Sequence, residues 1–324
     1  MDSSSQEEKG KHKITEVKTF SVPFPLEEHQ GNLTINTNTL SKHSKKQITN
    51  QAFKFHSQGN ISKAAKYYQQ LINHGCNDHR VFSNYGVILQ ALSKLEEAEA
   101  SYRKAIELNP GYALAHSNLG SILQDLGNLQ EAELFTRTAI EIKPDYADAH
   151  YNLGSILQAL GNLQEAEVSY RKAIELKPDY ALAHYNLGSI SQALGNLQEA
   201  ELYTRKAIEL KPDYADSHYN LGIILKDLGK LQDAELYTRK AIELKTNYAD
   251  AHLNLGSILK DLGQSLNAEL STRKAIDIKP DFAEAHLNLG LILKDIGQLK
   301  EAELSTRKAI DIKPDFAEAH LNLG

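Results

Sequence analysis

The sequence predicts an all-α solenoid made of helix-turn-helix units, on three observations. A glycine recurs eight times at intervals of 34 residues, each time as the last residue of a similar tetrapeptide, such as residues 151–154. Residues 268–290 recur unchanged as residues 302–324. The apolar content is carried mainly by helix-forming Ala, Leu and Ile, with no Trp and one Met, so a large aromatic core is not expected. The recurring glycines are Gly86, Gly120, Gly154, Gly188, Gly222, Gly256, Gly290 and Gly324.

Each 34-residue unit contains the signals for two helices and a turn. In residues 147–180, Gly154 and Ala166 are small enough to let two helices approach closely. Gly161 suits a turn that needs a positive φ, and Pro178 ends the second helix because it cannot continue the hydrogen-bond ladder. One unit cannot bury its apolar face alone, so stacking of successive units is expected to stabilise the array.

This unit resembles the tetratricopeptide repeat, in which helix A, a tight turn and helix B carry these residue types at the same positions. The resemblance implies a right-handed superhelix whose A helices line a concave groove. Seven full units are expected over residues 79–316, preceded by a divergent unit over 45–78. A disordered polar tail is expected over residues 1–44. Residues 317–324 read as the truncated start of a further unit, so we expect the sequence to be a fragment of a longer array.

Some units depart from the pattern. Ser93 stands at the turn position that glycine holds elsewhere, and Thr246 replaces the exit proline. Thr204 stands where other units carry a tyrosine on helix B. We expect the bulk of that ring to be supplied by the preceding residue, as at Tyr203 and Tyr237.

An asparagine occupies the sixth position of helix A in every unit from residue 79 onward. A side-chain amide has donors and an acceptor, so it can bond to the backbone of a peptide in front of it. The series resembles the asparagine ladder in the repeat arm of O-linked N-acetylglucosamine transferase, which implies binding of an extended peptide. The alternative is that each amide simply bonds within its own unit. The series is Asn84, Asn118, Asn152, Asn186, Asn220, Asn254, Asn288 and Asn322.

Other polar residues are expected beside this series in the groove. Tyrosines could stack on a bound peptide and glutamines could hydrogen-bond to it. Lysines further along, each followed by an aspartate, could contact a polar partner, or could simply form a solvated helix face. These candidates are Tyr151, Tyr185, Tyr219, Gln158, Gln192, Lys226, Lys260 and Lys294.

Histidine recurs at the fourth position of helix A. Members of successive units stand too far apart to ligate one zinc ion, so we expect each ring to pack inside its repeat. The sequence has no glycine-rich phosphate loop, nucleophile elbow or paired-cysteine motif. Neither a metal, a cofactor nor catalysis is therefore expected within residues 1–324. The histidines are His116, His150, His184, His218, His252, His286 and His320.

The charges argue against several partners. The chain has 36 Lys and Arg against 42 Asp and Glu, with both signs interspersed and no basic stripe, so neither nucleic acid nor an anionic membrane is an expected partner. No signal peptide or membrane-spanning run is visible, so a cytoplasmic location is expected. Repeats that capture chaperone C-terminal carboxylates use cations on helix A, but Asp148, Asp216 and Asp250 hold the second position here.

The sequence thus predicts a protein-interaction scaffold that binds an extended or helical polypeptide in the groove of its repeats. Near-identical repeats of this kind also resemble the front halves of bacterial glycosyltransferases, methyltransferases and sulfotransferases. The alternative is therefore a substrate-presenting arm whose catalytic domain lies beyond Gly324. A third hypothesis is self-association, in which units stack head to tail through an open end.

Overall fold

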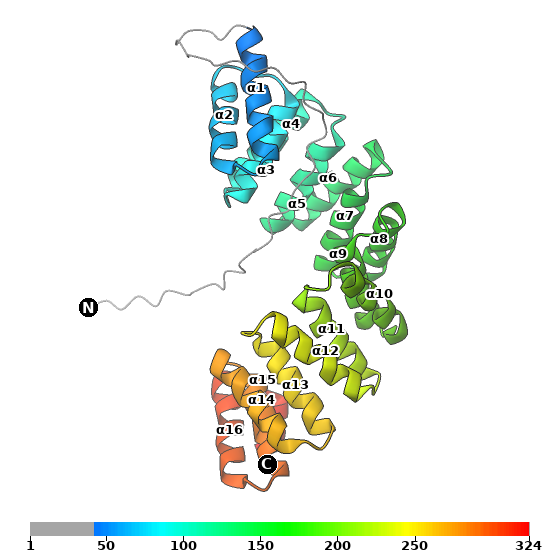
Figure 1. Cartoon of the computed structure of the whole chain (residues 1–324), viewed down its shortest axis with the longest axis vertical. Helices are drawn as coiled ribbons and strands as arrows, with labels where there is room; N and C mark the ends of the chain where they lie inside the picture. Colours follow the sequence, from blue (N-terminus) through cyan, green and yellow to red (C-terminus); the bar gives the residue numbers. More distant parts are fainter. Residues whose placement is uncertain (1–41, 324) are drawn as a thin grey trace, which may run out of the picture. The chain divides into compact units, whose positions relative to one another are not determined.

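The computed structural model describes residues 42–323, which form a series of paired helices (Figure 1). The tail predicted over residues 1–44 lies outside the described residues, except that its last three positions begin the first helix at Lys42. By its contacts the chain divides into two compact units, one up to Pro144 and one from Asp145. Each unit is described below by itself.

The first unit contains three helix pairs. We call the first helix of each pair A and the second helix B. Each A helix packs on its own B helix, and each B helix packs on the A helix of the next pair within the unit. The helices are α1 (Lys42–Ser57), α2 (Ile61–Asn73), α3 (His79–Ala91), α4 (Leu95–Leu108), α5 (Ala113–Asp125) and α6 (Leu129–Ile142).

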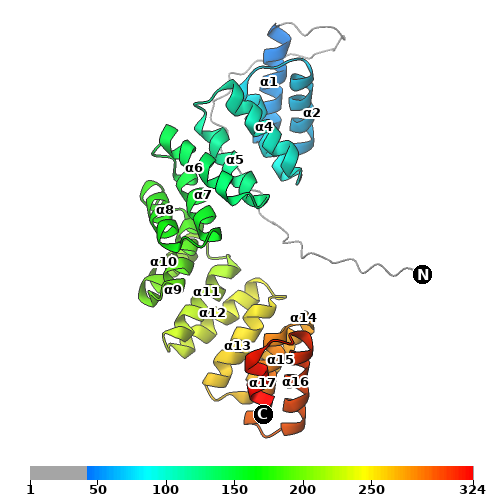
Figure 2. The ribbon, with the colours of Figure 1, turned by 180° about the vertical axis from the view of Figure 1, so that it is seen from behind.

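The second unit repeats the same pairing and ends in an A helix, α17 (Figure 2). Its consecutive A helices contact one another directly from α7 to α15, whereas its B helices pack mainly on A helices. The A helices therefore form one layer and the B helices the other. The helices are α7 (Ala147–Ala159), α8 (Leu163–Leu176), α9 (Ala181–Ala193), α10 (Leu197–Leu210), α11 (Ala215–Asp227), α12 (Leu231–Leu244), α13 (Ala249–Asp261), α14 (Ser265–Ile278), α15 (Ala283–Asp295), α16 (Leu299–Ile312) and α17 (Ala317–Leu323).

Close approach of the two helices in a pair depends on the recurring glycine of helix A. A Cβ atom added to Gly154 would lie 2.8 Å from the ring of Tyr170, which is fully buried on α8. Ala166 and Ala173 of α8 are also fully buried. Such contacts leave no room for a larger side chain, so the glycine sets the distance between the helices.

Tyr203 and Tyr237 do not fill the places of the missing rings opposite the glycines, although Tyr237 packs, partly buried, against a core cluster. Thr204 itself fills the position opposite Gly188 and is fully buried. Tyr203 is half-buried, and its hydroxyl accepts a hydrogen bond from Nη1 of Arg171 at 2.6 Å. One step along a helix rotates the side chain by about 100°, so the neighbouring residue cannot point into the same space.

Each core is shared between successive pairs. In the second unit, Leu221 and Leu225 of α11 pack with Ala234 of α12 and with Ile258 of α13. All four side chains are fully buried. The apolar face of one pair is therefore covered by the next A helix, as expected for a stacked array.

The turn between helix A and helix B needs a backbone conformation that glycine adopts easily. Gly161 has a φ of 81°, and Gly127 and Gly195 have similar values. Ser93 stands at the same place with a φ of 58° and is the only residue other than glycine with a positive φ in the described part of the chain. The left-handed conformation costs an L-residue roughly 1–2 kcal/mol.

We predict that Ser93→Gly stabilises the α3–α4 pair by about 0.5–1 kcal/mol, because relief of this strain exceeds the added flexibility of glycine. Slower hydrogen exchange of the α3 and α4 backbone amides would show it. Ser101→Gly, within α4, is the matched control and should speed exchange. Equal destabilisation by both substitutions would contradict the prediction.

Candidate functional site

The A layer of the second unit presents four rows of partly accessible side chains. They stand at the second, fifth, ninth and twelfth positions of α7, α9, α11 and α13, while the third, eighth, tenth and eleventh positions are buried. Because consecutive A helices contact one another, these rows form one surface. We call it the A wall and define it by Asp148, Tyr151, Ser155, Gln158, Leu182, Tyr185, Ser189, Gln192, Asp216, Tyr219, Ile223, Lys226, Asp250, Leu253, Ser257 and Lys260.

Each tyrosine of the A wall is paired with a second tyrosine that sequence analysis did not select. The ring of Tyr151 stacks on Tyr180, with centroids 4.9 Å apart. Tyr185 meets Tyr214 edge-on at 5.2 Å. The second ring of each pair is the last residue of the unit, just before the next A helix. Its recurrence every 34 residues is the signal that could have identified it.

The last pair follows the same pattern, with Tyr219 and Tyr248 4.9 Å apart. All six rings are half-buried. Three consecutive repeats therefore each present two neighbouring rings, which is a large area for contact with another molecule.

Carboxylates lie beside these rings. Asp148 lies near Tyr180 and Asp216 lies near Tyr248, so that their charges act on the two phenols. Burial, followed by the negative charge of these aspartates, raises the pKa of both phenols. Burial and then Asp216 also raise the pKa of Tyr185 to about 12. The aspartates at the second position of helix A are thus part of the aromatic surface.

Asp250 completes the series. Burial and then the charge of Asp250 raise the pKa of Tyr219 to about 12. Asp250 is exposed, whereas Asp148 and Asp216 are half-buried. The A wall of these repeats is therefore aromatic and acidic.

The predicted asparagine series lies between successive pairs. Nδ2 of Asn186 donates to the hydroxyl of Tyr170 at 3.1 Å and to that of Tyr151 at 3.4 Å. Asn254 donates to the hydroxyl of Thr238 at 3.2 Å, and Asn288 repeats this with the threonine of the preceding B helix. Asn84 is buried, and Nδ2 of Asn322 donates to the carbonyl oxygen of Glu318 in its own helix at 2.8 Å. The bonded amides tie helix A to neighbouring backbone or to the preceding helix B.

Three members of the series differ in their surroundings. Asn118 and Asn220 are buried, and within the described residues their Nδ2 atoms donate no hydrogen bond. Asn152 is half-buried. A peptide in front of the A layer could therefore reach the half-buried amides more readily than the two buried ones.

The predicted glutamines and lysines also join successive repeats. Gln192 donates to Asp227 at 2.9 Å, across 35 residues. Lys226 donates to Ser257 at 2.6 Å, and its Nζ lies 3.8 Å from Asp261.

Three of the predicted residues complete this row. Lys260 lies 3.8 Å from Asp295, and Gln158 accepts a hydrogen bond from Tyr170 at 3.1 Å. Lys294 is exposed at the end of α15. A lysine followed 35 residues later by an aspartate, as Lys260 is by Asp295, is a sequence signal for these contacts between repeats.

The recurring histidines pack against the exit from the preceding helix B. Nε2 of His184 lies 3.0 Å from the carbonyl oxygen of Pro178, and its Nδ1 is buried without a hydrogen bond. His116 and His218 have the same arrangement. The ring therefore donates from Nε2 in its neutral form, and a proton added at Nδ1 would find no acceptor. This geometry fits a structural role.

Comparison with family models assigns these repeats. Models described as tetratricopeptide repeat match residues 41–73, 113–146, 147–180, 181–214, 203–235, 249–282 and 283–316, and one described as TPR repeat matches residues 86–127. The chain belongs to the tetratricopeptide-repeat family. Tetratricopeptide repeats typically serve as scaffolds for protein–protein interaction.

Solved structures with the same fold agree. YrrB, described as a tetratricopeptide-repeat protein with an unusual peptide-binding site, is 27% identical, with a TM-score of 0.50 over 57% of this chain and 95% of YrrB. A chain of the Cut9–Hcn1 assembly is 16% identical, with a TM-score of 0.63 over 85% of this chain and 54% of that one. PilF of Pseudomonas aeruginosa is 23% identical, with a TM-score of 0.58 over 64% of this chain and 95% of PilF. The curated proteins give no match.

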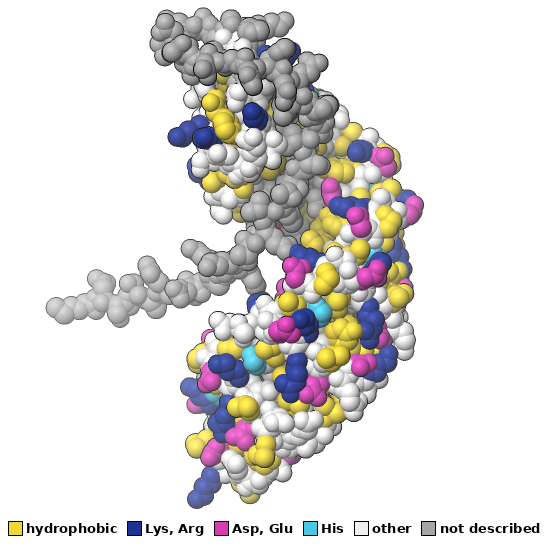
Figure 3. All heavy atoms as spheres, viewed as in Figure 1, with side chains coloured by type: hydrophobic (Ala, Val, Ile, Leu, Met, Phe, Trp, Pro, Cys, Tyr) yellow, Lys and Arg dark blue, Asp and Glu magenta, His cyan; other side chains and the backbone are white. Residues whose placement is uncertain are grey.

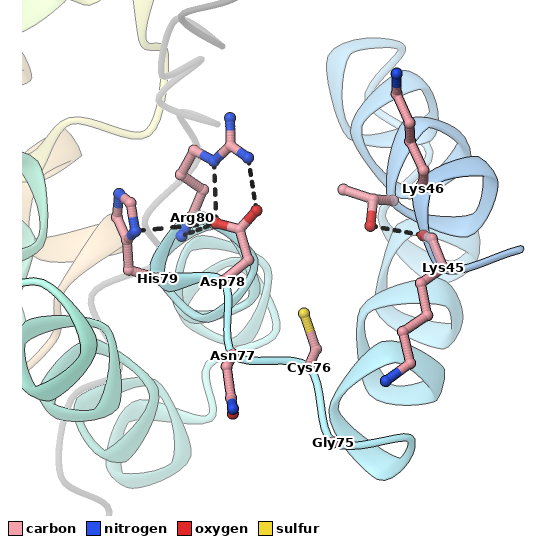
Figure 4. A pocket seen from close by; sticks show the side chains of 9 residues that line it. Lys45, Lys46, Gly75, Cys76, Asn77, Asp78, His79 and Arg80 are labelled. Carbon is pink, nitrogen blue, oxygen red and sulfur yellow. Dashed lines mark hydrogen bonds and ion pairs between the residues drawn. The ribbon is translucent and has the colours of Figure 1, made fainter. Parts of the chain in front are cut away.

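A second feature lies between the first two repeats, where an open hollow of about 660 Å³ separates α1 from the start of α3 (Figure 4). Two of its three lysine and arginine side chains have partners. Arg80 forms an ion pair with Asp78 at 2.6 Å, and Lys45 donates to the carbonyl of His74 at 2.9 Å. We assign no ligand to it. The hollow is lined by Lys45, Lys46, Thr49, Gly75, Cys76, Asn77, Asp78, His79 and Arg80.

No group of three or more His, Cys, Asp or Glu side chains within residues 42–323 could hold a metal ion. In the same residues, no helix is both long and apolar enough to cross a membrane.

We predict that Asn186→Ala and Asn220→Ala differ in their effect on stability. Loss of the bonds from Asn186 to the two tyrosines should cost about 1 kcal/mol, whereas Asn220 has no bond from Nδ2 to lose. Urea unfolding followed by circular dichroism would measure both variants against the unmodified chain. A larger loss from Asn220→Ala would contradict the assignment.

We predict that mild acid destabilises the array. Burial lowers the pKa of His56, His184 and His252 in the folded chain, against about 6.5 when unfolded. The unfolded chain therefore binds more protons as pH falls, and the stability present above about pH 6.5 is lost below it. The midpoint of thermal unfolding should fall between pH 8 and pH 5.5, and less so in His184→Gln. An unchanged midpoint would refute this.

Proposed function

We propose that the A wall of the second unit binds an extended or helical segment of another polypeptide. The observation that carries this proposal is the recurrence of a half-buried tyrosine pair in three consecutive repeats. Tyrosine offers a broad contact area, few rotatable bonds and a polar hydroxyl, so it suits recognition of a partner chain.

The A wall also provides hydrogen-bonding groups beside the rings. Ser155 and Ser189 are half-buried at the ninth position, and Gln158 and Gln192 at the twelfth. A bound segment could bond to these groups while its side chains contact the rings. Such a combination of apolar contact area and backbone hydrogen bonds is typical of peptide recognition.

The asparagine ladder remains part of the proposal in a reduced form. Asn152, Asn186, Asn254 and Asn288 are half-buried, so a bound backbone could reach them. The Nδ2 donors of the last three already bond to neighbouring helices, so a peptide would compete with those bonds. We therefore expect the rings to supply more of the binding energy than the amides.

The similarity to YrrB supports this proposal. YrrB is 27% identical over more than half of this chain, and its structure is described as having a peptide-binding site. This likeness makes peptide binding the leading function for the repeats of this chain.

Selection from a random twelve-residue peptide library displayed on phage would test the proposal with the full chain. Tyr185→Leu with Tyr219→Leu should abolish enrichment, since two ring pairs lose one member each. Leucine is compatible with the fold, because Leu253 already occupies the fifth position of α13 and Leu287 that of α15.

The matched control is Tyr203→Leu with Tyr237→Leu, which removes two rings from the B helices. This variant should enrich the same peptides as the unmodified chain. Equal enrichment by the A-wall variant, or loss of enrichment only in the B-helix variant, would overturn the proposal.

A further inference from the structure

Lysine side chains of this protein lie against the tyrosines beside the A wall, and one of them also lies near an aspartate. Nζ of Lys245 lies 4.1 Å from the ring centroid of Tyr248 and 3.9 Å from the carboxylate of Asp216. Lys177 and Lys211 lie over the last tyrosine of their own repeats, at 4.5 and 5.0 Å. The rings beside the A wall therefore accept ammonium groups, through the attraction of a cation to the face of an aromatic ring.

The B helices use the same chemistry with arginine. The guanidinium of Arg171 lies 5.4 Å from the ring centroid of Tyr203 and donates to Glu199 at 2.6 Å. Arg205 lies 5.2 Å from the ring of Tyr237. An aromatic ring beside a carboxylate is thus the arrangement with which this protein binds both kinds of basic side chain.

The A wall adds carboxylates beside these rings, one of which, Asp216, is already paired with Lys245. Asp148, Asp216 and Asp250 stand beside the tyrosines, and Asp179 and Asp213 are exposed in the loops that precede α9 and α11. The visible face of the second unit carries both signs of charge interspersed (Figure 3). A carboxylate has several lone pairs, so it can accept hydrogen bonds from more than one donor.

The cations of the A wall do not offset this charge. Along α7, α9 and α11 the four rows contain no lysine or arginine before Lys226. Lys226 itself is held by Ser257 and lies near Asp261 of the next A helix. The wall between Asp148 and Asp250 therefore complements a positively charged partner.

We propose that the polypeptide bound by the A wall is basic, with lysine or arginine side chains seated between the tyrosines and the aspartates. This inference rests on the proposed function and adds the chemistry of the partner. Neighbouring helices pack about 8–10 Å apart and an extended chain advances about 3.3–3.6 Å per residue, so a cation at roughly every third residue would match the repeat.

Three fluorescein-labelled twelve-residue peptides would test the inference with the full chain. They contain the repeats Arg-Ser-Gly, Gln-Ser-Gly and Glu-Ser-Gly, and binding is followed by fluorescence anisotropy. The arginine peptide should bind about tenfold or more tightly than the glutamine peptide, and the glutamate peptide least tightly, with the difference decreasing in 0.5 M salt.

Variants in which carboxylates are replaced by amides show which negative charges attract the arginine peptide. Asp216→Asn with Asp250→Asn should weaken binding of the arginine peptide about three- to tenfold, and the glutamine peptide should be unaffected. Glu209→Gln with Glu243→Gln removes the same total charge from exposed positions on α10 and α12, and should change binding little.

The outcomes separate the two proposals. If the glutamine or glutamate peptide binds as tightly as the arginine peptide, and Tyr185→Leu with Tyr219→Leu abolishes that binding, the basic partner is refuted and peptide binding by the A wall stands. If the B-helix charge variant weakens the arginine peptide as much as the A-wall variant, the attraction is unspecific and the inference fails. If the arginine peptide binds but the tyrosine variant has no effect, the proposed function fails as well.

Discussion

The close contact between the two helices of each pair is the constraint on which the rest of the structure depends. A glycine on helix A lies against a buried tyrosine or threonine on helix B, as Gly154 does against Tyr170 and Gly188 against Thr204. Neither contact has room for a Cβ atom at the glycine. The pair is therefore a nearly fixed body, and the next A helix covers the apolar face that it leaves exposed.

This constraint determines which residues can recognise a partner. Once helix A is fixed by its buried positions, the second, fifth, ninth and twelfth positions must lie on the accessible side, and the same positions of the next A helix lie beside them. A side chain repeated every 34 residues becomes a row. The tyrosines and aspartates of the A wall are such rows, whereas the asparagines and histidines are drawn into contacts between successive repeats.

The repeat, the helix pairs and the turns could be predicted from the sequence because their signals are local. Gly161 has the positive φ that its place in the unit requires, and Gly154 makes the close contact expected of it. The partners of polar side chains were harder to predict. Whether the amide of Asn186 faces a groove or Tyr170 depends on how two helices from different repeats are rotated, which spacing alone does not reveal.

The same limit explains the tyrosines that sequence analysis misplaced or missed. Tyr203 was expected in the core, but a rotation of one residue brings it under Arg171 instead. Tyr180 was not selected, yet it stacks on Tyr151 of the same repeat. The contact of Tyr203 joins two repeats and that of Tyr180 joins the end of a repeat to its own helix A, and spacing alone reveals neither.

The central proposal is that the A helices of the second unit form the binding surface. Site-specific photo-crosslinking tests this most directly, with benzoylphenylalanine placed at Tyr219 in one variant and at Tyr237 in another, and the arginine peptide as probe. The account predicts a crosslink from position 219 on the A wall and none from position 237 on helix B. A crosslink from position 237 alone would contradict it.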